Sequence, residues 1–125
     1  NEKIEASYHN FEIDKITSLR SIFSKNDIFG LNVTVPYKEQ VLSQLDELDE
    51  VARKIGAVNT ILPFYKNGKL SSLKGFNTDA FGFQQLIKPY LKAHHTNALV
   101  LGSGGSSKAI IHILNLYNID YNVYL

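Results

Sequence analysis

The stretch Ala98-Leu-Val-Leu-Gly-Ser-Gly-Gly-Ser-Ser-Lys-Ala-Ile-Ile111 determines the predicted fold class. Residues 97–101 have the apolar composition of a buried strand, residues 102–105 form a glycine-rich turn, and residues 106–117 have helical periodicity. A glycine motif between a strand and a helix predicts a dinucleotide-binding fold, because this is the local structure that such a motif needs.

Each small residue of this turn has a definite role in that prediction. Gly102 permits the tight turn, and Gly104 lets the main chain approach a pyrophosphate. The helix N-terminus offers free N–H groups and the positive end of its dipole to phosphates. Ser107 occupies the third glycine position, where a small residue still allows close packing of helix and strand. A purely structural turn is the alternative interpretation.

Strands and helices alternate through the rest of the chain. The predicted strands are residues 4–8, 29–35, 57–64, 69–76, 97–101 and 121–125, and the predicted helices are residues 14–25 (capped by Asp14), 37–54, 77–92 and 106–117. This alternation is typical of an α/β fold with a largely parallel sheet. Asn67-Gly68 nevertheless predicts a hairpin between two neighbouring strands. A change in composition near residues 80–96 indicates two domains that meet at a connecting helix.

Composition excludes several classes of protein. The 125 residues carry a net charge of +1, with basic and acidic residues interspersed, so there is no electrostatic footprint for nucleic acid. The absence of cysteine excludes disulfides and thiolate metal sites, and the four histidines have no shared spacing, so no metal site is predicted. No apolar run approaches the ~18 residues of a membrane span. We expect a cytoplasmic protein without membrane contact.

Lys38 is the first candidate for chemistry. Val33 and Val35 alternate with polar residues as in a strand, and Pro36 suits a first helical position. Lys38 then lies at the positive end of the helix dipole, which disfavours a cation by up to ~1 kcal/mol. A lysine in such a place can serve in proton transfer. A solvated lysine beside Glu39 is the alternative.

A second polar cluster follows a different strand. Asn77-Thr78-Asp79 lies at a strand-to-helix junction, where one such residue suffices as an N-cap. Asn59 interrupts an otherwise apolar strand, and if its amide is buried it needs partners from a bound polyol or from a neighbouring loop. Ligands of open α/β sheets lie beyond the carboxyl ends of the strands. Thr34, Lys38 and Asp79 are all predicted there, and an ammonium and a carboxylate at one rim form a plausible acid–base pair.

Four motifs together resemble the shikimate dehydrogenase family, in its bacterial NADP-dependent form. They are Asn32-Val-Thr-Val-Pro-Tyr-Lys38, Gly56-Ala-Val-Asn-Thr60, Gly75-Phe-Asn-Thr-Asp79 and Gly102-Ser-Gly-Gly-Ser106. The resemblance implies a three-layer α/β substrate-binding domain with a mostly parallel sheet at residues 1–79. It implies a connecting helix and the first part of a Rossmann-type NADP-binding domain at residues 80–125. Asn1 and the strand ending at Leu125 suggest a fragment cut at both ends.

The resemblance also implies an activity, the reversible NADPH-dependent reduction of 3-dehydroshikimate to shikimate in aromatic amino-acid (chorismate) biosynthesis. Lys38 is then the catalytic proton donor and acceptor, Asp79 supports it, and Thr34 and Asn59 hold ring hydroxyls. The implied NADP contacts are Gly102, Ser103, Gly104, Gly105, Ser106 and, more weakly, Glu50. The expected partner is the small-molecule substrate, and the expected assembly is a monomer or homodimer.

Two rival functions stay open at this point. One is a quinate/shikimate dehydrogenase paralogue, and the other is a nucleotide-binding module without catalysis. The residue that selects NADP or NAD normally lies at the end of the second nucleotide-binding strand, whereas Asp120 lies at its beginning. The choice of NADP therefore rests on the resemblance alone, and we expect the isolated 125-residue chain to be inactive.

Overall fold

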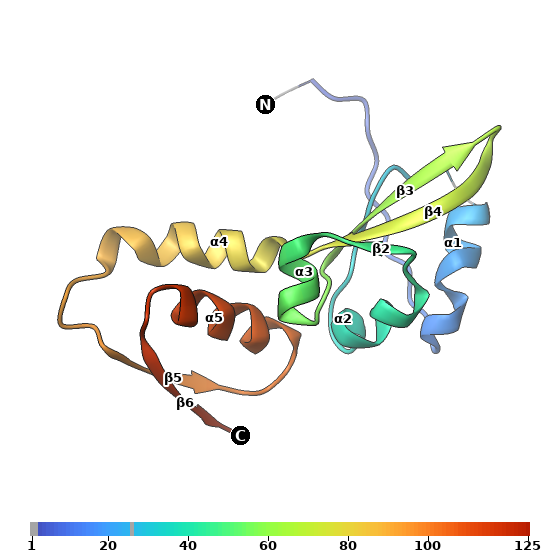
Figure 1. Ribbon diagram of the computed structural model, residues 1–125. Helices are drawn as coiled ribbons and strands as arrows, with labels where there is room; N and C mark the ends of the chain where they lie inside the picture. Colours follow the sequence, from blue (N-terminus) through green and yellow to red (C-terminus); the bar gives the residue numbers. More distant parts are fainter. Residues whose placement is uncertain (1–2, 26) are drawn as a thin grey trace.

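The computed structural model describes residues 3–25 and 27–125 and contains two sheets (Figure 1). The strands are β1 (Leu31–Asn32), β2 (Glu47–Leu48), β3 (Thr60–Lys66), β4 (Lys69–Phe76), β5 (Asn97–Leu101) and β6 (Asp120–Tyr124). The α-helices are α1 (Leu19–Lys25), α2 (Tyr37–Gln40), α3 (Glu50–Ile55), α4 (Thr78–Ile87) and α5 (Gly105–Leu116), and the 3-10 helices are η1 (Ile16–Ser18), η2 (Val41–Gln44) and η3 (Lys88–Tyr90). The predicted α/β class is confirmed.

The first sheet is mixed, with the strand order β1-β3-β4-β2. β3 and β4 form the predicted hairpin, in which Asn67 and Gly68 both have positive φ angles (52° and 72°). β1 also runs antiparallel to β3, and only β2 runs parallel to β4. The expectation of a mostly parallel sheet is therefore wrong here, because the two-residue turn reverses the chain at the centre of the sheet. β5 and β6 are parallel, as a strand–helix–strand connection requires.

The predicted single helix over residues 37–54 is wrong, because the chain forms α2, η2, β2 and α3 there. Asp46 interrupts the helical pattern through two hydrogen bonds with β4. Its N–H donates to Leu73 O (3.0 Å), and its Oδ2 accepts from Leu73 N (2.7 Å). Asp49 then starts a new helix by accepting from Ala52 N (2.8 Å). Gly56 ends that helix with φ 71°, as predicted.

Several further boundaries differ from the sequence prediction. The strand predicted at 57–64 is β3 (Thr60–Lys66), and the helix predicted at 77–92 ends as α4 at Ile87, followed by η3. Residues 4–8 form no regular structure, and the strand predicted at 29–35 is limited to β1. Asp14 does not cap the following helix, which begins after Lys15 without a side-chain cap. Element ends are where sequence patterns are weakest.

α4 packs against α5, and the two helices lie side by side in Figure 1. The shared core contains Ile55 and Ala57 from the first sheet's region, Ala80 from α4, and Ala109 and Ile113 from α5. A separate core fills the space between α1 and the first sheet. The start of α5 lies against both α2 and Ala57, because a Cβ added to Gly105 would lie 2.8 Å from Lys38 Cβ and 3.3 Å from Ala57 Cβ. Within the described residues no helix is both long and apolar enough for a membrane span.

Candidate active site

Lys38 lies in the first turn of α2, one residue after the helix begins at Tyr37. Pro36 immediately precedes the helix rather than occupying its first position. The start of α5 covers the aliphatic part of Lys38, since a Cβ added to Gly105 would lie 2.8 Å from Lys38 Cβ and 3.3 Å from Ala57 Cβ. Only 13% of the Lys38 side chain is exposed. The interpretation of Lys38 as a solvated residue is therefore wrong.

Asp79 lies in the first turn of α4, which Asn77 caps. The Asn77 side chain accepts from Ala80 N (3.2 Å) and donates to Ala57 O (3.0 Å), and it is buried. One residue of the Asn77-Thr78-Asp79 run therefore forms the cap, which leaves the side chains of Thr78 and Asp79 for other contacts.

The Lys38 ammonium and the Asp79 carboxylate meet directly. Lys38 Nζ donates to Asp79 Oδ2 at 2.6 Å, and Asp79 Oδ1 accepts from Asn59 Nδ2 at 2.8 Å. Both carboxylate oxygens are thus hydrogen-bonded, which fixes the carboxylate plane. The acid–base pair expected from the sequence is present as a contact.

Asn59 is fully engaged by the protein. Its Nδ2 also donates to Thr78 Oγ1 (2.9 Å), and its Oδ1 accepts from Thr78 N (2.9 Å) and Thr60 Oγ1 (3.0 Å). The sequence left two sources open for these hydrogen bonds, a ligand or a neighbouring loop. The structure supplies the second, because the start of α4 satisfies the Asn59 amide.

The glycine loop lies next to this cluster. Lys38 Nζ donates a second hydrogen bond to Ser106 Oγ, in the first turn of α5, at 3.0 Å. An ammonium has three N–H donors, so Lys38 retains one for a further acceptor. A carbonyl or hydroxyl oxygen of a substrate is such an acceptor.

The loop geometry fits a bound pyrophosphate at Gly104. Gly102 has a φ of 99°, which confirms the tight turn that glycine was expected to permit. A Cβ added to Gly104 would meet nothing within 4 Å, and Ser103 and Gly104 are exposed. The small Ser107 is buried against the loop. Gly105 differs from the other loop glycines, because its free face is covered by Lys38 rather than open to a ligand.

Among residues 3–25 and 27–125, the predicted site residues Thr34 and Glu50 make no hydrogen bond or ion pair with the Lys38 cluster. Thr34 is exposed in the turn before α2, where its carbonyl accepts from Tyr37 N (2.9 Å). Glu50 is exposed in α3 and accepts from Lys54 Nζ at 2.7 Å. This hydrogen bond and the Lys54 charge lower the pKa of Glu50. Its partner therefore belongs to its own helix rather than to the glycine loop.

Sequence reasoning did not find the contacts between α2 and α5. Besides the Lys38–Ser106 hydrogen bond and the covering of Lys38 by Gly105, an ion pair joins Lys108 Nζ to Glu39 Oε2 at 2.6 Å. The partners lie more than sixty residues apart, and local patterns carry no signal for such a distance. The small residue at Gly105 was visible, but it was assigned to the ligand.

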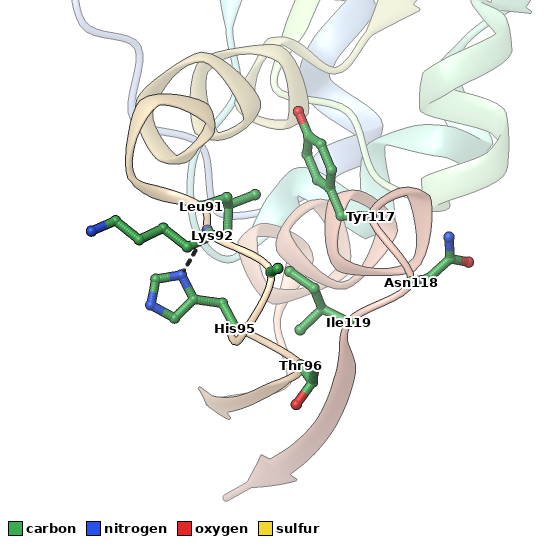
Figure 2. Close-up of a pocket in the computed structure, with 8 residues that line it drawn as sticks. Leu91, Lys92, His95, Thr96, Tyr117, Asn118 and Ile119 are labelled. Carbon is green, nitrogen blue, oxygen red and sulfur yellow. Dashed lines mark hydrogen bonds between the residues drawn. The ribbon is translucent and has the colours of Figure 1, made fainter.

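A cavity of about 300 Å³ lies away from these residues, between the α4–β5 connection and the turn after α5 (Figure 2). Figure 2 shows His95 folded back on its own connection, where its Nδ1 accepts from Lys92 N at 3.1 Å. None of the predicted site residues lines this cavity. The clustered chemistry is at Lys38, and we place the candidate active site there.

Comparison with known proteins relates the chain to one group of enzymes. Residues 1–61 match the family described as "Shikimate dehydrogenase substrate binding domain". A shikimate dehydrogenase (NADP(+)) of Helicobacter hepaticus is 44% identical over 112 residues, which are 90% of this chain and 39% of that protein.

Solved structures agree in fold as well as sequence. The crystal structure of shikimate dehydrogenase 1 from Peptoclostridium difficile is 40% identical with a TM-score of 0.83, covering 96% of this chain and 44% of that one. The Thermus thermophilus enzyme in complex with NADP(H) and shikimate is 35% identical with a TM-score of 0.66, covering 86% and 39%. The chain spans less than half of each relative. Residues 1–61 therefore match the family of shikimate dehydrogenase substrate-binding domains, and the chain is similar to shikimate dehydrogenases in sequence and in fold.

Proposed function

We propose that this chain carries the acid–base pair and part of the nucleotide site of an NADP-dependent shikimate dehydrogenase, which interconverts 3-dehydroshikimate and shikimate. The observation that supports this most strongly is the 2.6 Å contact between Lys38 and Asp79, beside the first turn of the glycine-loop helix. The names of the relatives support the substrate and the cofactor. We also propose residues 1–79 as the substrate-binding domain and residues 80–125 as the connecting helix and start of the nucleotide domain.

In the proposed mechanism Lys38 is the general acid. NADPH, when bound, supplies the hydride, and negative charge then builds on the carbonyl oxygen of the substrate. The remaining N–H of the Lys38 ammonium donates to that oxygen and transfers its proton, a form of catalysis that contributes ~10²–10⁴-fold. Asp79 orients the ammonium through the 2.6 Å hydrogen bond. In the reverse direction the neutral amine of Lys38 accepts the proton of the substrate hydroxyl.

The other predicted site residues are proposed contacts of the substrate or of the cofactor. Thr34 and Asn59 are proposed ligands of ring hydroxyls, although Asn59 must exchange one of its present hydrogen bonds to make that contact. The main chain at Gly102–Gly104 is the proposed pyrophosphate site, since it is open at Gly104. Glu50 is a weaker proposed cofactor contact. We further propose a cytoplasmic monomer or homodimer, which light scattering of the purified protein tests.

The experiment is an assay of NADPH oxidation with 3-dehydroshikimate by the full-length protein. We expect Lys38→Ala to lower kcat by ~10²–10⁴-fold with KM changed only a few-fold, because the proton donor is lost while most substrate contacts remain. Lys66→Ala, at the exposed tip of the β3–β4 hairpin, is the matched control and retains full activity. Near-normal turnover by Lys38→Ala removes Lys38 from the mechanism.

The same assay separates the rival functions. Preferential oxidation of quinate, or preference for NAD over NADP, identifies a quinate/shikimate paralogue. A nucleotide-binding module without catalysis shows cofactor binding and no turnover. Such a module offers no explanation for the hydrogen bonds that join Lys38, Asn59 and Asp79. The isolated 125-residue chain is expected to be inactive, and measurable turnover by it contradicts that expectation.

A further inference from the structure

Ser106 is the second partner of the Lys38 ammonium. Its Oγ accepts from Lys38 Nζ at 3.0 Å, while Asp79 Oδ2 accepts the first hydrogen bond at 2.6 Å. The two acceptors come from different helices, α5 and α4 respectively. Two fixed acceptors define the direction of an ammonium group, and therefore the direction of its third N–H, whereas a single acceptor leaves the group free to rotate.

The residues around Ser106 hold this contact in place. On one side, Gly105 packs against the Lys38 side chain so closely that a Cβ would lie 2.8 Å from Lys38 Cβ and 3.4 Å from its Cδ. On the other side, Lys108 binds Glu39 at 2.6 Å. Because contacts on both sides tie α5 to α2, the Ser106 hydroxyl faces a lysine whose aliphatic part is itself fixed by packing.

We propose that Ser106 is a positioning residue for Lys38, with its hydroxyl holding the ammonium in the direction that serves proton transfer. The inference rests on the proposed function, in which Lys38 is the general acid. It departs from the role expected for Ser106 from the glycine motif, which was contact with the cofactor alone. Since a hydroxyl accepts and donates at once, the Ser106 proton stays available for an anionic oxygen while Oγ accepts from Lys38.

Loss of this hydroxyl affects both the direction and the charge of Lys38. A hydrogen bond to the charged form of a group favours that form, so its removal makes the ammonium easier to deprotonate. The charged groups near Lys38 are Asp79 from α4, Glu39 from α2 itself and Lys108 from α5, which is paired with Glu39. Ser106→Ala changes none of these charges, so a change in pH dependence reports on the lost hydrogen bond.

The test compares Ser106→Ala, Ser106→Cys and Ser106→Thr in the full-length protein, with kcat and KM measured from pH 6 to pH 10. We expect Ser106→Ala to lower kcat for 3-dehydroshikimate reduction about tenfold, which is typical of a lost hydrogen bond to a charged group. Its alkaline limb moves to lower pH, and KM for NADPH stays within threefold. Ser106→Cys, which is close in size but a weak acceptor, should show the same changes in kcat and pH profile as Ser106→Ala. Ser106→Thr keeps a hydroxyl and should retain the activity of the parent.

The control is the double variant Glu39→Gln with Lys108→Gln, which removes the neighbouring bridge without changing net charge. It is expected to leave the alkaline limb in place. The inference is overturned if Ser106→Ala leaves kcat and its pH profile unchanged, if its defect is confined to KM for NADPH, or if the double variant shifts the limb equally. The last result assigns the effect to docking of α5 rather than to the hydroxyl.

A measurement without turnover distinguishes failure of this inference from failure of the proposed function. If the parent protein does not reduce 3-dehydroshikimate, the proposed function fails, and Lys38 is then probed by competitive acetylation and mass spectrometry. Ser106→Ala should raise the acetylation of Lys38 severalfold relative to Lys66 of the same molecule, because the neutral amine reacts. An unchanged ratio overturns the contact between Ser106 and Lys38 as a functional one.

Discussion

Two adjacent residues of α2 form ion pairs of equal length in very different surroundings. Lys38 Nζ lies 2.6 Å from Asp79, and Glu39 lies 2.6 Å from Lys108 Nζ. The side chains of the first pair are 13% and 33% exposed, and those of the second are 41% and 42% exposed. Asp79 has a further partner in Asn59, and Lys38 in Ser106.

This difference indicates that burial and additional partners, rather than distance, distinguish the proposed acid–base pair from a docking contact. Breaking a buried pair on one side leaves an uncompensated charge and costs about 3–5 kcal/mol, whereas an exposed pair contributes about 0–1 kcal/mol. The Lys38–Asp79 pair lies between these limits because Asp79 is one-third exposed. The predictions below test this ranking.

The largest effect is expected for Asp79→Asn. The amide keeps the shape of the side chain but removes the charge beside the Lys38 ammonium, so the unpaired cation destabilises the fold by about 2 kcal/mol after allowance for solvent screening. In the full-length protein kcat should also fall at least ~10²-fold, since Lys38 is no longer oriented. Urea unfolding and the NADPH assay measure the two quantities. Effects as small as those expected for the double variant Glu39→Gln with Lys108→Gln contradict the ranking.

Gly105→Ala tests whether contact with α5 shields the Lys38–Asp79 pair. The added methyl would lie 2.8 Å from Lys38 Cβ, at the inflexible base of that side chain. Overpacking of this kind costs about 1–3 kcal/mol, partly offset by the better helix propensity of alanine. Gly104→Ala is the matched control for unfolding, because its methyl meets nothing within 4 Å. Equal midpoints of urea unfolding for the two variants show that α5 does not press on Lys38.

Parts of the fold with strong local signals were predictable from the sequence. The β3–β4 hairpin follows from Asn67-Gly68, and the β5–α5 unit follows from an apolar strand before a glycine turn. The division of residues 37–54 was not predictable from helical periodicity. Asp46 leaves the helix because its main chain and carboxylate both bind Leu73, a partner that only the folded hairpin provides.

The candidate site, like the fold, has parts that were predictable from the sequence and parts that were not. Lys38 and Asp79 were singled out because each was unusual in its own segment, as a cation at the start of a helix and an extra polar residue beside a cap. Their contact was a hypothesis, since it depends on how α2, α4 and α5 pack. The glycine motif already accounted for Ser106 as a cofactor contact, and local sequence patterns do not indicate its hydrogen bond with Lys38.

Asp46 supplies a third ion pair that refines the comparison. Arg20 binds it at 2.6 Å with exposures of 41% and 39%, close to those of the Glu39–Lys108 pair. Asp46 differs by accepting a main-chain N–H from Leu73. That bond, followed by the bond from Arg20, lowers the pKa of Asp46 from its usual 3.8. A main-chain hydrogen bond is fixed by the sheet, so the carboxylate gains more than an exposed ion pair provides.

Asp46→Asn should therefore cost about 1 kcal/mol at pH 7, after discounting for solvent exposure. Because the pKa of Asp46 is lowered on folding, its stabilisation is present above the unfolded value and is lost as pH falls through the folded value. The difference in unfolding free energy between parent and Asp46→Asn should shrink below about pH 4. Urea titrations at several pH values measure it, and a pH-independent difference assigns the cost to shape instead.

The smallest effect is expected for the charge-neutral double variant Glu39→Gln with Lys108→Gln. The pair it removes is exposed on both sides, so the variant should lose less than about 0.5 kcal/mol of unfolding free energy. In 1 M salt the parent and the variant should be equally stable, because salt screens the pair. A loss near 2 kcal/mol contradicts the ranking by burial, because it makes the exposed pair as valuable as the buried one. A small loss leaves packing of Gly105 on Lys38 as the main contact that holds α5 against α2. In that case Gly105 is the residue of the glycine loop that packs on the proposed general acid, and its missing side chain leaves the space that Lys38 occupies.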